Sequence, residues 1–118
     1  MKKSIFWLIL VALTALSMMP TTLLPPQAFN IWDKAQHALG FSALTLSAFW
    51  AFPQNKRQIP ILLLLHGGLI ELAQTASGWR HGDWLDLLAD AIGIGLITGL
   101  WALSTAARQT LPQHSRKS

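Results

Sequence analysis

The fold of this protein is decided by an apolar stretch that carries one acidic residue, "IPILLLLHGGLIELAQTA" (residues 59–76). A helix rises about 1.5 Å per residue, so a stretch of this length can cross about 30 Å of hydrocarbon with little slack. The carboxylate of Glu71 would be costly in contact with lipid, because charged side chains in membranes usually face the bundle interior and pair. The stretch therefore predicts a transmembrane helix with a polar inner face.

Three more apolar runs flank this one, at residues 5–24, 35–52 and 87–107, and prolines or glycines separate neighbouring runs. Of the 118 residues, 52% are hydrophobic and only 12% are charged, which is about half the charge of a typical soluble domain. We therefore predict an all-α integral membrane bundle of four transmembrane helices in a single domain, residues 1–108. We expect the polar cytoplasmic tail, residues 109–118, to be disordered.

The basic residues are distributed unevenly around the four runs. Of the nine Lys and Arg residues, only Lys34 and Arg80 lie in the first and third connecting loops. Because cytoplasmic segments retain Lys and Arg, we predict that both termini are cytoplasmic and that the protein is a multi-pass protein of the inner (cytoplasmic) membrane. Lys2 and Lys3 before the first run also fit a signal peptide, and its cleavage would leave three helices. No basic face with interleaved aromatics exists, which argues against a nucleic-acid partner.

Acidic and other polar residues gather toward the predicted outer side. Positions three or four apart share a helix face, so Glu71 and Gln74 form one stripe and Asp83, Asp86 and Asp90 form another. A third stripe, formed by Asp33 and His37, lies at the start of the second helix. Together they predict a polar pocket that opens outward between the second, third and fourth helices. The predicted binding residues are Asp33, Lys34, His37, Glu71, Gln74, Arg80, Asp83, Asp86 and Asp90.

The order and spacing of these residues resemble the VanZ-like family over nearly the whole chain. The matching motifs are D-K-x-x-H followed by Phe (residues 33–41), E-x-x-Q (71–74), R-x-x-D-x-x-D (80–86) and A-[N/D]-x-x-G (89–93). The family is similar to a teicoplanin-resistance protein, and its members are mostly small bacterial membrane proteins. The resemblance implies an envelope-associated ligand and a link to glycopeptide resistance. The chain departs from the family pattern at Asp90, where Asn is usual.

The polar residues allow three interpretations of function. In the first, a VanZ-like membrane protein binds or handles an envelope-associated ligand, such as a lipid-linked or cell-wall precursor or a glycopeptide, with membrane lipids as further partners. In the second, an enzyme acts on a lipid or lipid-linked headgroup, with His37 and Glu71 as the catalytic acid/base pair and Arg80 as an anion clamp. In the third, an accessory subunit uses the polar cluster only as an internal latch.

Several single residues carry expectations of their own. Asp33 fits either an N-cap of the second helix or a carboxylate that orients His37. For Glu71 we predict Arg80 as the partner, or else His37. Lys34 is expected to contact headgroups. His66, in the middle of the third run, predicts a hydrogen bond between helices.

Metal and cofactor chemistry find little support in the sequence. The chain has no cysteine, which excludes thiolate metal sites and a cysteine nucleophile. The run from Arg80 to Asp90 contains carboxylates and an imidazole, which can hold a divalent cation. It lacks a tight ligand signature such as two His at i,i+4, so the sequence predicts neither a metal ion nor a cofactor.

Overall fold

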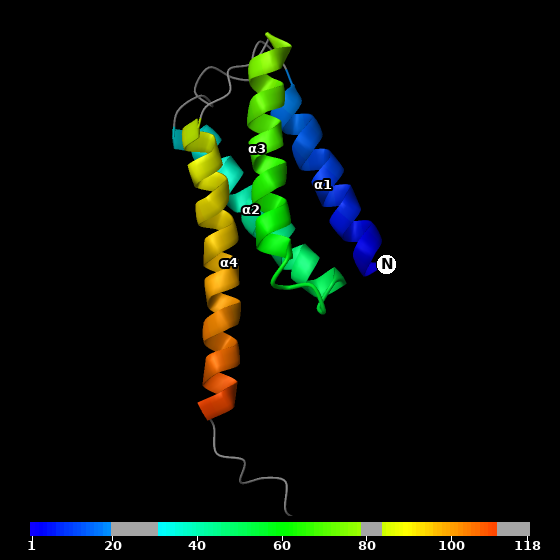
Figure 1. Ribbon diagram of the computed structural model, residues 1–118. Coiled ribbons are helices and arrows are strands. Elements are labelled where there is room, and N and C mark those ends of the chain that lie inside the picture. The colour runs from blue at the N-terminus through cyan, green and yellow to red at the C-terminus, as the bar shows by residue number, and fades with distance from the viewer. Residues whose placement is uncertain (20–30, 79–83, 111–118) are drawn as a thin grey trace, which may run out of the picture.

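The computed structural model describes residues 1–19, 31–78 and 84–110, and four helices account for nearly all of them. The helices are α1 (Lys2–Met18), α2 (Ile31–Ala51), α3 (Ile59–Ser77) and α4 (Trp84–Thr110), arranged as in Figure 1. No strand occurs within these three ranges. The predicted all-α class is confirmed.

Two of the helices, α3 and α4, are long and apolar enough to cross a membrane. The other two fall short of the same standard in the described part of the chain. Helix α1 has 17 residues there, which is less than the length that spans about 30 Å. Helix α2 has 21 residues, but Lys34, Gln36 and His37 lower its hydropathy near the start. Length and composition thus identify two membrane-crossing helices of the predicted four.

Local chemistry explains where the helices begin and end. Helix α1 ends at Met18, before the end of the predicted run, and Met19 is extended with φ −64° and ψ 140°. Pro20 follows, and a residue before proline avoids the helical region. Helix α3 has a proline in its first turn and ends at Ser77, before Gly78, which adopts the left-handed conformation at φ 79°.

Helix α4 exceeds its predicted length at both ends. It begins at Trp84 and continues to Thr110, so the first two residues of the predicted tail are helical. Asp86 in the first turn and Arg108 in the last turn both favour the helix, because they complement its macrodipole. The rest of the predicted disordered tail, residues 111–118, lies outside the described part of the chain.

Helix α2 is the centre of the bundle and packs most extensively against α4. Its residues Phe41, Leu44 and Phe49 form the core with apolar side chains of the other helices. The two helices approach closely at Gly93, where an added Cβ would collide with the carbonyl oxygen of Ala38. Small residues permit such close approach between membrane helices.

The bundle has a basic end. There the ammonium groups of Lys2, Lys3 and Lys56 lie over the rings of aromatic residues, at 5.3, 5.4 and 5.6 Å from the ring centroids. The partners are, in the same order, Trp50, Phe52 and Trp101. Since Trp50 and Phe52 mark the end of α2, the residues near the start of α2 lie at the opposite end of the bundle.

Candidate functional site

The end of the bundle opposite these lysines contains a cluster of buried polar residues from three helices. Helix α2 contributes one, α3 contributes two and α4 contributes two. None is more than 7% exposed, and they are His37, Glu71, Gln74, Asp86 and Asp90. All five belong to the predicted binding set, and the structure buries them in three neighbouring helices, as that prediction requires. Their role in binding stays a prediction.

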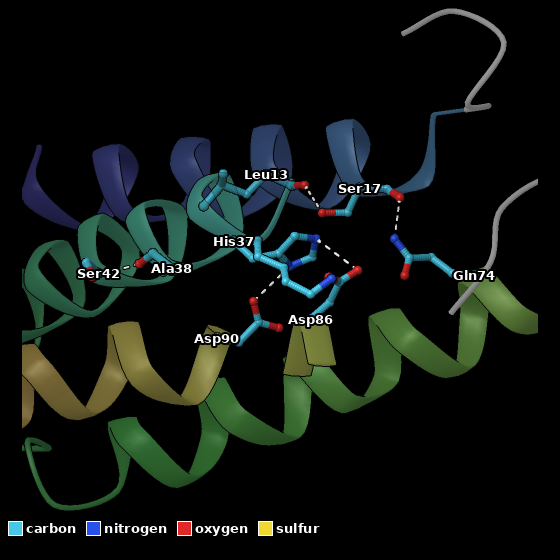
Figure 2. Close-up of polar contacts among 9 residues, drawn as sticks. Leu13, Ser17, His37, Ala38, Ser42, Gln74, Asp86 and Asp90 are labelled. Atoms are coloured by element: carbon cyan, nitrogen blue, oxygen red, sulfur yellow. Dashed lines mark hydrogen bonds and ion pairs between the residues drawn. The ribbon is translucent and has the colours of Figure 1, made fainter. Parts of the chain in front are cut away.

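His37 lies at the centre of this polar cluster. Its Nδ1 atom is 2.8 Å from Oδ1 of Asp90, and its Nε2 atom is 3.8 Å from Oδ2 of Asp86 (Figure 2). Asp86 and Asp90 are four residues apart on α4, so their carboxylates lie on one face and reach both ring nitrogens. The 2.8 Å contact with Asp90 orients the imidazole, and the carboxylate of Asp86 lies near its other nitrogen.

Lys34 extends the polar cluster toward its edge. Its Nζ atom lies 3.7 Å from Oδ1 of Asp86, and the lysine side chain is 34% exposed. The predicted headgroup contact for Lys34 stays a prediction, while the structure gives the ammonium an acidic partner within the bundle. Lys34, Asp86, His37 and Asp90 therefore form a continuous series of charged or polar contacts.

Glu71 is buried beside the same imidazole. One ligand-type atom each from His37, Glu71 and Asp90 lies within 4.8 Å of the other two. The sequence named Arg80 or His37 as the partner of Glu71, and the structure brings His37 close. Arg80 lies outside the described residues, so its part in the prediction stays untested.

Gln74 connects the polar cluster to α1, a helix that the predicted pocket did not include. Its Nε2 atom donates to the carbonyl oxygen of Ser17 at 2.7 Å (Figure 2). Ser17 lies in the last turn of α1, where the backbone carbonyls have no partner within the helix. In the sequence, the contact between Gln74 and Ser17 could have been suspected only because the last carbonyls of any helix need hydrogen-bond donors from outside it.

The bare backbone of Gly67 makes room for the carboxylate of Asp90. A Cβ added at Gly67 would lie 2.8 Å from Oδ2 of Asp90 and 3.4 Å from Cδ1 of Leu87. Gly67 also lies one turn before Glu71, on the same face of α3. Glycine at this position therefore lets the carboxylates of α3 and α4 approach each other.

Other predicted residues have different outcomes. Helix α2 begins at Ile31, so Asp33 lies inside the helix and the N-cap interpretation of Asp33 does not hold. The side chain of Asp33 lies outside the described part of the structure, as do Arg80 and Asp83. His66 forms the predicted contact between helices, because its Nε2 atom lies 2.9 Å from Oγ1 of Thr14 in α1.

A separate apolar cavity of about 270 Å³ lies between α1, α2 and α3. Phe6, Phe52, Leu63 and His66 are among its lining residues, which places it toward the basic end. It is therefore distinct from the predicted polar pocket. The predicted outward opening of that pocket depends on residues 20–30 and 79–83, which lie outside the described ranges.

The polar cluster favours some chemistries over others. Its described residues include three carboxylates, one lysine and one imidazole, so a cation or a hydrogen-bond donor suits them better than an anion. An imidazole beside carboxylates is also a combination of groups that acid–base catalysts use. The catalytic role of His37 and Glu71 stays a prediction.

Comparison with known proteins gives no match, since no protein-family model, curated protein or solved structure is significantly similar to this chain.

Proposed function

We propose that this chain is a VanZ-like integral membrane protein of the inner membrane that binds an envelope-associated ligand at its polar cluster. The observation that carries the proposal is the burial of His37, Glu71, Asp86 and Asp90 together at one end of the bundle. Ionisable residues cost about 2.5–3.5 kcal/mol each at mid-bilayer and are functional candidates by default. A ligand of the bacterial envelope, lipid-linked or derived from cell-wall precursors, is the class that the family resemblance favours.

The outer surface of the bundle supports a lipid environment for all four helices. Soluble monomers rarely expose large contiguous apolar areas, yet each helix here exposes large aliphatic side chains. Examples are Leu8 and Val11 on α1, Leu39 and Leu46 on α2, Leu65 and Leu69 on α3, and Leu88 and Leu96 on α4.

The low hydropathy of α2 is compatible with four spans. A hydropathy average treats Lys34 and His37 as though they met lipid, whereas both lie beside carboxylates of α4. Pairing inside the bundle removes much of the cost of placing such groups in a membrane. The shortfall of α2 therefore reflects the site that it carries.

The charge difference between the two ends supports the proposed orientation. Lys2, Lys3 and Lys56 occupy the end opposite the polar cluster, and Lys and Arg favour the cytoplasmic side. The polar cluster then faces outward. The chain has no cysteine, so single-cysteine variants allow a clean test. We expect Ala76→Cys to react with an impermeant maleimide in intact cells and Gln54→Cys to react only after permeabilisation; the reverse pattern would refute the orientation.

Glu71→Gln tests the ligand-binding role, because it removes the charge and keeps the shape. The variant and the wild-type protein are purified in detergent and titrated with a fluorescent lipid-linked cell-wall precursor. We expect at least tenfold weaker binding by Glu71→Gln, with unchanged abundance and thermal stability. The control is His66→Gln, which alters an imidazole outside the polar cluster and should bind like the wild type.

A structural latch is the second candidate, and one contact favours it. The 2.8 Å contact between His37 and Asp90 joins α2 to α4, as expected for an accessory subunit that uses the cluster only to hold its helices. In that case Glu71→Gln lowers abundance and thermal stability, and any precursor binding by the wild type survives in the variant. This outcome would reject the ligand-binding proposal.

A further inference from the structure

The ligand-type atoms of His37, Glu71 and Asp90 converge from three different helices. All three residues are buried, and one ligand atom from each lies within 4.8 Å of the others. Ligands about 2.1 Å from a tetrahedral ion lie about 3.4 Å from one another. The existing spacing is thus close to that of a metal site, and side-chain movements of about 1 Å would complete it.

A second observation concerns the other nitrogen of the His37 ring. Histidines that bind metals almost always direct the second ring N–H to a carboxylate, a backbone carbonyl or water. Here Nδ1 faces Asp90, while Nε2 lies 3.8 Å from Oδ2 of Asp86, which in turn pairs with Lys34. Asp86 therefore occupies the place of an outer-shell carboxylate that orients a metal-binding imidazole.

The surroundings of the three residues also suit an ion. The missing side chain of Gly67 lets Oδ2 of Asp90 lie against the backbone of α3, since an added Cβ would be only 2.8 Å from that oxygen. Gln74 is 1% exposed, and its Oε1 atom accepts no hydrogen bond within the described part of the chain. Gln74 lies three residues after Glu71 on the same helical face, and amide oxygens are suitable ligands for hard cations. The amide oxygen of Gln74 is thus a buried acceptor one helical turn from Glu71.

We propose that His37, Glu71 and Asp90 bind one divalent transition-metal ion, with Zn²⁺ as the first choice. One imidazole nitrogen and two carboxylate oxygens match the donor types that Zn²⁺ accepts in sites with three protein ligands. Calcium and magnesium prefer all-oxygen sets. The ion takes the place of the proton shared between Nδ1 of His37 and Oδ1 of Asp90.

This inference deepens the proposed function and rests on it, because the ion would lie within the ligand-binding cluster. Three protein ligands leave a fourth position open. An anionic oxygen of an envelope ligand can bind there even though the surrounding side chains are acidic. The ion thereby reconciles an acidic cluster with a phosphate- or carboxylate-bearing ligand.

The test is calorimetric titration of the purified full-length protein, without a histidine tag, with ZnCl₂ alone. We expect one ion per chain and release of about one proton, measured by repeating the titration in buffers of different ionisation enthalpy. Glu71→Gln and Asp90→Asn should each weaken binding at least tenfold. Asp86→Asn should weaken it by about 10- to 100-fold as an outer-shell change.

The control variant is His66→Asn, which removes an imidazole outside the cluster and should bind Zn²⁺ like the wild type. Because a cluster variant can fail to fold, the wild type is also titrated with Co²⁺, whose visible spectrum reports tetrahedral coordination by nitrogen and oxygen. Absence of stoichiometric Zn²⁺ binding, or binding that survives both Glu71→Gln and Asp90→Asn in folded protein, would overturn the metal site.

The two proposals fail in different ways. If Zn²⁺ fails to bind and the lipid-linked precursor binds equally well to protein stripped with EDTA, the metal inference is wrong and the proposed function stands. If Zn²⁺ binds as expected and the precursor does not bind to the metal-loaded protein, the metal site stands and the envelope-ligand proposal is wrong.

Discussion

Replacing Gly93 by alanine tests whether the close approach of α2 and α4 holds the polar cluster together. The added Cβ would collide with the carbonyl oxygen of Ala38 and lie 3.0 Å from Oγ of Ser42. Carbon atoms need about 3.5 Å or more from their neighbours, so the two helices must separate by about 1 Å. Because Ala38 adjoins His37 and Gly93 lies one turn from Asp90, the separation also stretches the 2.8 Å contact between His37 and Asp90.

The expected cost follows from three effects. Overpacking costs about 1–3 kcal/mol, loss of a polar contact between membrane helices costs about 0.6–2 kcal/mol, and alanine recovers about 1 kcal/mol of helix propensity over glycine. The net loss in free energy of unfolding for Gly93→Ala is therefore about 1–4 kcal/mol. Thermal unfolding of the detergent-solubilised protein, followed by circular dichroism, measures this loss.

Gly95→Ala is the matched control, since it lies on the same helix and an added Cβ there meets nothing within 4 Å. We expect it to be as stable as the wild type or up to about 1 kcal/mol more stable. If Gly93→Ala and Gly95→Ala unfold at the same temperature, the close contact of α2 and α4 at Gly93 contributes nothing to stability.

Two further predictions use the same unfolding assay. Gly67→Ala should lose about 1–3 kcal/mol, because its Cβ would lie 2.8 Å from Oδ2 of Asp90, whereas Gly68→Ala has open space and should not be destabilised; equal stability of the two would contradict this packing. Thr14→Val removes the hydroxyl that contacts His66 at 2.9 Å and should cost about 0.6–2 kcal/mol, so a variant as stable as the wild type would show that this contact is energetically neutral.

The helices could be predicted well where helix-breaking residues set the limits of an apolar run. The third run was predicted at residues 59–76 and α3 is Ile59–Ser77, because a proline and a glycine lie at its two ends. Helix α4 was predicted too short, since polar residues such as Asp86 and Thr110 continue a helix although they do not continue an apolar run. An apolar run indicates which part of a helix avoids water. The helix itself can continue into polar residues at either end.

The described members of the polar cluster could be predicted, as could the proximity of His37 to Glu71, but the contact of His37 with Asp90 could not. Spacing of three or four residues placed Glu71 with Gln74 and Asp86 with Asp90 on shared faces. Which faces meet depends on the rotation and register of neighbouring helices, and the sequence does not contain these directly. Gln74 therefore found an unpredicted partner, the backbone carbonyl of Ser17.

The arrangement of three metal-ligand residues could not be predicted either, because it too depends on how the helices pack. Local metal motifs place two or more ligands within one turn of a single helix, as in His at i,i+4. Here the three ligand-type residues come one from each of α2, α3 and α4. Only the packing of three helices brings His37, Glu71 and Asp90 together, so no stretch of sequence contains the site.

The polar character of α2 has a consequence for the biogenesis of the protein. In the proposed bilayer, His37 of α2 has its polar partner on Asp90, which the ribosome makes 53 residues later. A lysine or an unpaired imidazole is disfavoured in lipid, so nascent α2 must stay near water or the translocon until α4 emerges. Under this proposal, stable integration of α2 is a late, cooperative step that depends on the synthesis of α4.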